Sequence, residues 1–247
     1  MLVKVVLVDV NPKMIAAWRN TFEENPEVEI VQGSLLAQPV SAWVTPTNSR
    51  GSMDGGLDGI LKKHFGQIIE SRVQQEIARL YAGVMPVGHA TFVPTGQVQP
   101  KYLISTPTMT GSSDDISATM NVALACAAAF QAVHMCNAND PGGIRAVALP
   151  GLGANTGKVP VEICADLMWT GYNLFREREF STFAELRQVL EAELGDLGPM
   201  AKQATPAKGN STTMPLKPAG APSPPPFVPP PSAKKFDEDF DDAEDED

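Results

Sequence analysis

Two glycine-rich loops constrain the fold of this chain most strongly, because each is predicted to follow a strand and to lead directly into a helix. The first loop lies within residues 44–59 and the second within residues 147–160. This order places backbone N–H groups and a helix N-terminus at the carboxyl edge of a sheet, where α/β proteins bind phosphorylated ligands. Neither loop contains GxxxxGK followed by Ser or Thr, and neither combines GxGxxG with an acidic partner. The loops therefore predict an anion site that is neither a P-loop nor a dinucleotide fingerprint.

The remaining hydrophobic pattern predicts alternating strands and helices. Apolar residues recur at helical spacing over residues 56–81, although Gly66 is expected to interrupt that helix. Strands are predicted over residues 2–9, 28–32, 42–45, 89–94, 102–106 and 145–149. Further helices are predicted over residues 11–24, 118–135 and 161–178. This alternation is typical of a mixed α/β fold.

Composition divides the 247-residue chain into a folded part and a C-terminal extension. We expect residues 1–195 to form one domain, a length that can bury a substantial core. Residues 196–235 are a Pro-rich linker, predicted to be disordered because its composition cannot bury enough apolar surface to offset chain entropy. Residues 236–247 are an acidic tail.

The acidic tail accounts for most of the net charge of −10, because nine of the 29 acidic residues lie within residues 237–247. The rest of the chain is close to neutral, which argues against direct nucleic-acid binding through charge. The tail itself has two interpretations. Acidic runs usually maintain solubility, but Phe236 and Phe240 among the carboxylates also suit docking to a protein partner with a basic groove.

The cysteines and the N-terminus bear on metal binding and location. Cys126, Cys136 and Cys164 show no paired spacing and fall in apolar helical stretches, so we expect buried, reduced thiols. The sequence implies no metal site and no cofactor. Residues 1–10 are too short for a signal peptide, and no apolar run has the length of a membrane span. We expect a cytoplasmic protein with no membrane partner, in the host cytoplasm if a phage encodes it.

The first loop contains the segment NSRGSMDGGLD, residues 48–58. In a structural interpretation its glycines are turn residues and Asp54 or Asp58 caps the next helix. That interpretation does not account for Asn48. In a functional interpretation the Gly55–Gly56 pair lets the backbone approach a ligand closely, because glycine has no Cβ.

This segment resembles the first ligand loop of the macrodomain family, in which a strand ends in Asn, a Gly-Gly pair follows, and an Asp lies just inside the next helix. Asn48, Gly55–Gly56 and Asp58 match those positions. The particular sequence is similar to a branch of the family known from bacteria and their phages. The resemblance implies an α/β fold of macrodomain type, a three-layer α/β/α arrangement with a central mixed sheet.

Two further segments carry the same resemblance. PGLGANTGKVP, residues 150–160, is similar to the family's second phosphate loop, and YLISTPTM, residues 102–109, is similar to a strand and turn of that branch. Asn155 and Lys158 stand where the branch often has glycine. Asn155 can adopt left-handed backbone, whereas Lys158 is expected either to pair with a phosphate or to point to solvent.

The resemblance implies a cleft between the two loops for ADP-ribose or an ADP-ribosylated macromolecule. Its implied catalytic residues are Asp58, which orients or deprotonates a water, and Asn48, which holds the distal ribose. Many members also have an Asp before the first loop that accepts a hydrogen bond from the adenine amino group, where this chain has Ser34. The implied ligand-binding residues are Ser34, Leu35, Asn48, Gly55, Gly56, Gly151, Leu152, Gly153, Ala154, Asn155, Thr156 and Gly157.

Three functions stay open on the sequence alone. The first is hydrolysis of an ADP-ribosyl linkage, with Asp58 contributing roughly 10²–10⁴ in rate as a general base. In the structural alternative Asp58 is only a favourable charge at a helix N-terminus, contributing roughly 0.3–1 kcal/mol. The second function is a non-catalytic reader of ADP-ribose or a related nucleotide whose tail recruits a partner. The third is a scaffold that has lost ligand binding, with Ser34 and Asn155 as its signs.

Overall fold

A six-stranded sheet organises the computed structural model, which describes residues 3–177, 180 and 182–195. The strand order is β2-β1-β6-β3-β5-β4. The strands are β1 (Lys4–Asp9), β2 (Val28–Gln32), β3 (Ala42–Asn48), β4 (Thr91–Pro94), β5 (Tyr102–Met109) and β6 (Ala146–Leu149). All neighbouring pairs are parallel except β4 with β5. The sheet is therefore mixed, and five of its strands present their carboxyl ends at one edge.

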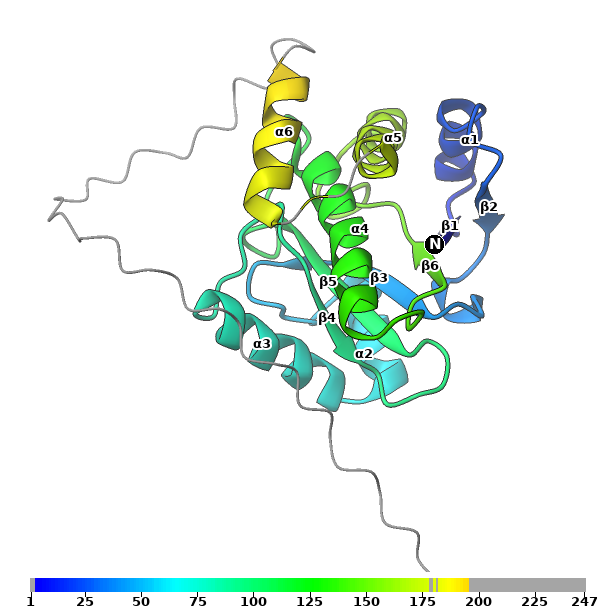
Figure 1. Cartoon of the computed structure of the whole chain (residues 1–247). Helices are drawn as coiled ribbons and strands as arrows, with labels where there is room; N and C mark the ends of the chain where they lie inside the picture. The colour runs from blue at the N-terminus through cyan, green and yellow to red at the C-terminus, as the bar shows by residue number, and fades with distance from the viewer. Residues whose placement is uncertain (1–2, 178–179, 181, 196–247) are drawn as a thin grey trace, which may run out of the picture. The chain divides into compact units, whose positions relative to one another are not determined.

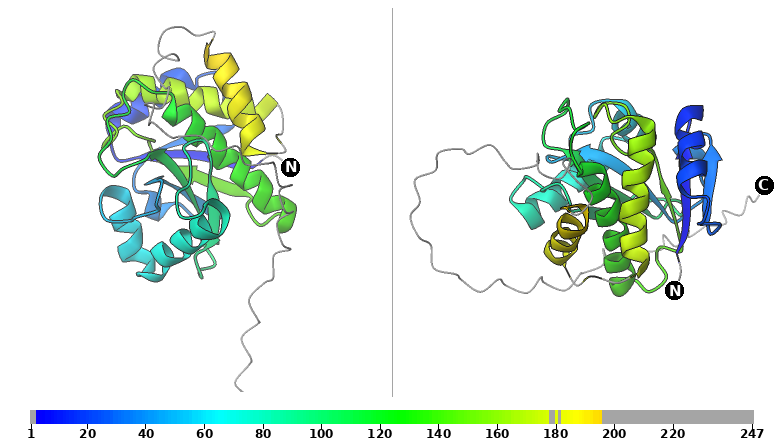
Figure 2. Two further views of the ribbon diagram at one scale, coloured as in Figure 1. Left: turned by 90° about the vertical axis from the view of Figure 1, so that its left-hand side faces the viewer. Right: turned by 90° about the horizontal axis from the view of Figure 1, so that it is seen from above.

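Helices cover both faces of this sheet (Figure 1). They are α1 (Pro12–Thr21), α2 (Gly56–Phe65), α3 (Ile68–Tyr81), α4 (Asn121–Asn139), α5 (Val161–Glu177) and α6 (Phe183–Gly195), with a short 3₁₀-helix η1 (Leu35–Ala37) after β2. Figures 1 and 2 show α1, α4, α5 and α6 on one face and α2 with α3 on the other. The described residues thus form the predicted three-layer α/β/α arrangement.

The alternation of side chains along the strands creates one hydrophobic cluster on each face. In β1, Val5 and Leu7 belong to the cluster under α1, α4, α5 and α6, whereas Val6 and Val8 belong to the cluster under α2 and α3. Successive strand residues point to opposite faces. Because both faces are covered, β1 is apolar throughout instead of alternating with polar residues.

The observed elements confirm the predicted order and the interruption at Gly66, with two main differences. Gly66 does end the first half of the predicted 56–81 helix, at a φ of 83° that favours glycine. Strands β3 and β5 are longer than predicted and continue to Asn48 and Met109, so both reach the carboxyl edge. Helix α6 was absent from the predicted pattern, yet its Leu186 and Leu190 are fully buried against the rest of the domain.

The described residues also bear on the cysteines, on membrane spans and on metal sites. Cys126, Cys136 and Cys164 are buried and free, as predicted. Within the described ranges, no helix combines the length and apolar character that a membrane crossing requires, and no cluster of three His, Cys, Asp or Glu side chains could hold a metal ion. The predicted linker and acidic tail, residues 196–247, lie outside the described residues.

Candidate functional site

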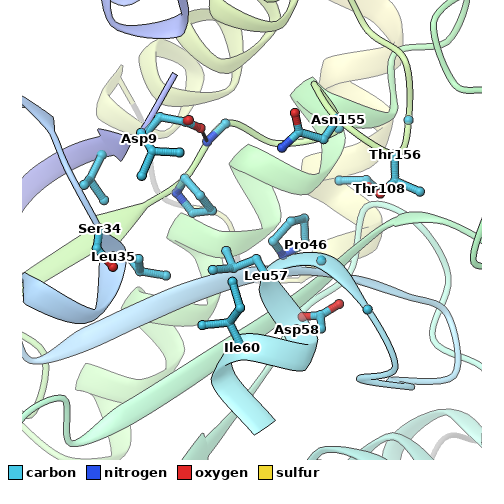
Figure 3. Close-up of a pocket in the computed structure, with 18 of the residues that line it drawn as sticks. Asp9, Ser34, Leu35, Pro46, Leu57, Asp58, Ile60, Thr108, Asn155 and Thr156 are labelled. Carbon is cyan, nitrogen blue, oxygen red and sulfur yellow. Dashed lines mark hydrogen bonds between the residues drawn. The ribbon is translucent and has the colours of Figure 1, made fainter. Parts of the chain in front are cut away.

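A pocket of about 390 Å³ lies at the carboxyl edge of the sheet, between the two glycine-rich loops (Figure 3). It is lined by many of the residues that the sequence predicted for ligand binding or catalysis: Ser34, Leu35, Gly55, Gly56, Asp58, Gly151, Gly153, Asn155, Thr156 and Gly157. The fold therefore brings together two loops that are about one hundred residues apart in the sequence.

The N-terminus of α2 forms one wall of the pocket. Gly55 is the N-cap and makes no side-chain capping hydrogen bond, and Gly56 begins the helix at a φ of 55°. The N–H groups in the first turn of an α-helix have no intrahelical acceptor, and the helix dipole makes this end electropositive. Because Gly55, Gly56 and Leu57 line the pocket, this helix end can bind an anion there.

The second loop forms the opposite wall with its backbone. Gly153, Asn155, Thr156 and Gly157 line the pocket. In the part of the chain that the structure describes, no acceptor is found for the N–H groups of these four residues. Unpaired backbone donors on two facing walls are suited to the oxygens of a diphosphate.

Asp58 lies in the first turn of α2 and is one of two ionisable side chains that line the pocket, the other being Asp9. The Thr45 hydroxyl of β3 donates a hydrogen bond to its Oδ1. Burial is the main cause that raises the pKa of Asp58, to about 7; the Thr45 hydrogen bond lowers it, and the charges of Asp54 and Glu70 raise it further. Asp58 therefore exchanges its proton close to neutral pH.

A network behind Asp58 holds the first loop in place. The buried Glu70 of α3 accepts a hydrogen bond from the backbone N–H of Met53 at 2.7 Å. Its other carboxylate oxygen forms an ion pair with the Lys62 ammonium at 2.6 Å. Burial alone would raise the pKa of Glu70, but the hydrogen bonds from Lys62, Met53 and Gln67 outweigh it and lower the pKa. Glu70 is thus a fixed negative charge that anchors the residues preceding Gly55.

Thr108, near the end of β5, lines the pocket, and its hydroxyl is an unpaired buried group behind the pocket surface. Its side chain is buried, and its hydroxyl has no hydrogen-bond partner within the described residues. A buried unpaired hydroxyl is unfavourable. Figure 3 labels Thr108 among the residues that line the pocket.

Asn48, predicted to hold the distal ribose, does not line the pocket and has protein partners at both ends of its amide. Its Oδ1 accepts the N–H groups of Arg50 and Ser52 at 3.0 and 3.2 Å. Its Nδ2 donates to Ser112 Oγ at 3.1 Å and to the Ser52 carbonyl at 3.4 Å. In this structure Asn48 shapes the first loop.

Two predicted residues of the second loop also lie away from the pocket. Leu152 is fully buried in the core, and its carbonyl accepts the Cys164 thiol at 3.1 Å. Ala154 packs against the same core and does not line the pocket. Lys158 adopts the left-handed backbone, with a φ of 58°, and its ammonium lies 3.4 Å from Asp115.

Sequence reasoning missed several pocket residues at the end of β1, in η1 and in α2. Asp9 lines the pocket from the end of β1, and Val10, Leu36, Leu57 and Ile60 add apolar surface. The signal for Asp9 was its position, because an acidic residue that ends a predicted parallel strand lies at the edge where such folds bind ligands. The apolar residues carried no separate signal, since each also fits a core position.

A three-layer α/β domain in which two glycine-rich loops line one pocket at the carboxyl edge of the sheet is an arrangement typical of nucleotide- and anion-binding proteins. The family model of the Macro domain matches residues 44–168, about half of the chain. The chain therefore belongs to the macrodomain family, whose members bind ADP-ribose. Its finer placement in a bacterial and phage branch stays a prediction.

Comparison with other proteins gives relatives of modest identity. An uncharacterized protein of Aquifex aeolicus is 30% identical over 142 residues, which is 58% of this chain and 78% of that protein. An uncharacterized protein of Aeropyrum pernix is 28% identical over 132 residues, which is 53% of this chain and 63% of that protein.

Solved structures with a similar fold include the macrodomain of Mycobacterium tuberculosis DarG. Its TM-score is 0.49 at 22% identity, covering 60% of this chain and 90% of that chain. The Oceanobacillus iheyensis macrodomain with ADP has a TM-score of 0.48 at 15% identity, covering 66% of this chain and 90% of that chain.

Proposed function

We propose that this chain binds ADP-ribose, free or attached to a macromolecule, and hydrolyses a linkage at C1″ of the distal ribose. The observation that supports the proposal most directly is the position of Asp58. It is a carboxylic acid whose pKa is raised to about 7, and it lies in a pocket whose facing walls carry unpaired backbone donors.

The charges that line the pocket match a ligand with an anionic middle and neutral ends. Backbone donors from α2 and from the second loop can surround a diphosphate. Asp9 and Asp58 lie on opposite sides of the pocket in Figure 3, so each faces a ligand end that carries neutral donors. ADP-ribose has this pattern, with a nucleoside at one end and a ribose at the other.

Asp58 can act as the general base of the reaction. In the proposed step a water oxygen attacks C1″, Asp58 accepts a proton from that water, and the bond between C1″ and the leaving group breaks. A base works best when its pKa is close to the working pH, because enough of it is deprotonated while it still accepts protons readily. Thr45 holds one carboxylate oxygen, which leaves the other available for the water.

A reader without catalysis is the second candidate, and the contacts of Asn48 favour it. All four hydrogen bonds of the Asn48 amide go to Arg50, Ser52 and Ser112. If Asn48 keeps these partners when the ligand binds, the distal ribose loses the residue that would position its reacting carbon. The pocket would then bind ADP-ribose without cleaving the linkage.

Calorimetric titration of the full chain with ADP-ribose, followed by turnover assays, tests both candidates. Asp58→Ala should lower turnover of ADP-ribosylated substrates by roughly 10² or more while changing ADP-ribose affinity little. Asp166→Ala is the control for the same substitution, because Asp166 lies on α5, is exposed and does not line the pocket. Binding without turnover on ester-linked, amide-linked and 1″-phosphate substrates would favour the reader. Absence of binding would overturn both.

The composition of the sequence supports a proposed division of the whole chain. We propose that residues 1–195 are the ligand-binding domain, that residues 196–235 are a linker, and that the acidic tail over residues 236–247 recruits a protein partner. A cytoplasmic location fits ADP-ribosylated substrates. A pull-down that compares the full chain with a chain ending at Lys235 tests the tail.

A further inference from the structure

The loop between β5 and α4, residues 110–120, contacts both glycine-rich loops although none of its residues lines the pocket. Near its start, the Ser112 hydroxyl accepts a hydrogen bond from the Asn48 amide of the first loop at 3.1 Å. Further along, the N–H of Ile116 donates to the carbonyl of Gly157 in the second loop at 3.1 Å. The β5–α4 loop therefore links the two loops from outside the pocket lining.

The side chain of Ile116 packs against two glycines of the second loop. Ile116 is 3% exposed and belongs to the hydrophobic cluster under α1, α4, α5 and α6. A Cβ added at Gly157 would lie 2.6 Å from Ile116 Cγ1, and one added at Gly153 would lie 2.9 Å from its Cδ1. Carbon atoms pack best about 3.5–4.0 Å apart, so these positions have no room for a side chain. Ile116 is thus in direct contact with the backbone of two residues that line the pocket.

The peptide group between Gly157 and Lys158 is held at both ends. Its carbonyl accepts the Ile116 N–H, and its N–H donates to the Asn155 carbonyl at 3.2 Å. The carbonyl is therefore directed to Ile116 and not to a bound phosphate, whose oxygens a second acceptor would repel. The Lys158 ammonium also lies 3.4 Å from Asp115. That ion pair is exposed and contributes little, so the buried contact of Ile116 is the stronger support.

Ile116 is itself fixed relative to α4. Its carbonyl accepts the N–H of Thr119 at 3.0 Å and the Thr119 hydroxyl at 2.8 Å. The same hydroxyl accepts the N–H of Asn121, the first residue of α4, at 3.3 Å. The side chain that supports the second loop therefore starts from a closed turn on a buried helix.

We propose that Ile116 is a positioning residue that holds the second loop in the conformation that receives the diphosphate. The inference rests on the proposed function, because it concerns how the same pocket is kept ready for ADP-ribose. Ile116 does not line the pocket, so it acts through Gly153 and Gly157. Without its side chain the second loop samples more conformations, and the ligand has to order the loop when it binds.

Calorimetric titration of the full chain with ADP-ribose tests the proposal through two matched substitutions. Ile116→Ala should weaken binding by about tenfold, the effect of ordering about one more backbone residue. Ile144→Ala should keep the wild-type affinity, because Ile144 is fully buried in the same cluster but precedes β6, at the edge of the sheet opposite the pocket. Both variants should melt several degrees lower than the wild type, so a loss of stability alone does not produce the difference in affinity.

Two further measurements distinguish a positioning role from a structural one. Ile116→Val keeps most of the side chain and should bind ADP-ribose more tightly than Ile116→Ala; if Ile116→Ala does not fold, Ile116→Val should still show a smaller loss that Ile144→Ala does not show. Without ligand, the amides of Lys158 and Val159, which bond within the second loop, should exchange hydrogen faster in Ile116→Ala than in Ile144→Ala.

The outcomes separate the inference from the proposed function. Wild-type affinity in Ile116→Ala, equal losses in Ile116→Ala and Ile144→Ala, or unchanged exchange in the second loop would each overturn the inference and leave the proposed function intact. Absence of ADP-ribose binding by the wild type would overturn the proposed function, and the inference with it.

Discussion

The hydroxyl of Thr45, on β3, donates a hydrogen bond to the carboxylate of Asp58, in the first turn of α2. The bond joins the central sheet to the N-terminus of the helix that forms one wall of the pocket. Thr45 is fully buried, so the hydroxyl has a fixed direction. The carboxylate is thereby oriented in the pocket before any ligand arrives, which is the condition for efficient general-base catalysis.

Thr45→Val should shift the pH dependence of turnover to higher pH. Burial, with the charges of Asp54 and Glu70, raises the pKa of Asp58 to about 7, whereas the hydrogen bond from Thr45 lowers it. Without that bond the pKa rises, so Asp58 becomes a base only at more alkaline pH. The readout is the pH profile of kcat/KM.

Thr47→Val is the matched control for this experiment. Thr47 is on the same strand and equally buried, but its hydroxyl pairs with Ser105 at 2.8 Å. Its profile should keep the wild-type midpoint. Equal shifts in both variants would mean that the effect comes from general loss of packing, and Thr45 would have no specific role in orienting Asp58.

Asp58→Asn should stabilise the folded protein at alkaline pH. The folded pKa of about 7 is raised above the ordinary 3.8, so the folded state binds the proton more tightly than the unfolded state. The free energy of unfolding therefore falls as the pH rises from about 4 to about 7, by up to roughly 4 kcal/mol. An Asn cannot ionise and avoids this loss.

The comparison to make is the melting temperature of Asp58→Asn against wild type at about pH 8 and at about pH 4.5. The variant should melt higher at pH 8, and the difference should shrink at pH 4.5, where wild-type Asp58 is protonated. A difference that does not change with pH would show that Asp58 is an ordinary exposed carboxylate in the folded state.

Gly55→Glu should abolish the rise in melting temperature that ADP-ribose produces by mass action on the folded state. Gly55 has a φ of −162°, which any residue adopts, and no heavy atom lies within 4 Å of an added Cβ. The new side chain therefore fits the fold but brings bulk and negative charge to the anion site. Gly55→Gln separates charge from bulk and should lose less affinity. An unchanged shift in Gly55→Glu would place the ligand elsewhere.

A chain ending at Gly195 should melt at the same temperature as the full chain, because residues 196–247 cannot bury much apolar area by composition. A chain ending at Glu177 should melt several degrees lower, since it lacks the buried Leu186 and Leu190 of α6. Differential scanning calorimetry of the three chains checks both statements. A large loss in the Gly195 chain would mean that the C-terminal extension packs on the domain.

The sequence predicted the positions of most strands and the two loops, because strand, glycine and helix signals are local, but it did not predict the order of the strands in the sheet. It did not predict the partners of Asn48, since Ser112 is 64 residues away and only the folded loops bring the two together. Asp9 was overlooked because an acid before Asn11-Pro12 also fits a turn that precedes a helix. The spacing of Phe183, Leu186 and Leu190 does carry a helical signal for α6, but it lies close to the Pro-rich segment.

The amide of Asn48 either binds the distal ribose or only shapes the first loop, and two variants distinguish these roles. Asn48→Ala should weaken ADP-ribose binding by up to roughly tenfold if its amide turns toward the ligand, the effect of one neutral hydrogen bond. Ser112→Ala removes the 3.1 Å contact that holds Nδ2 away from the ligand and should leave affinity unchanged or increase it. Titration of both variants with ADP-ribose measures these effects, and turnover of Asn48→Ala should fall further because the reacting carbon is no longer positioned. If Ser112→Ala instead weakens binding as much as Asn48→Ala does, the Asn48–Ser112 bond is part of the binding-competent pocket, and Asn48 acts only by shaping the loop.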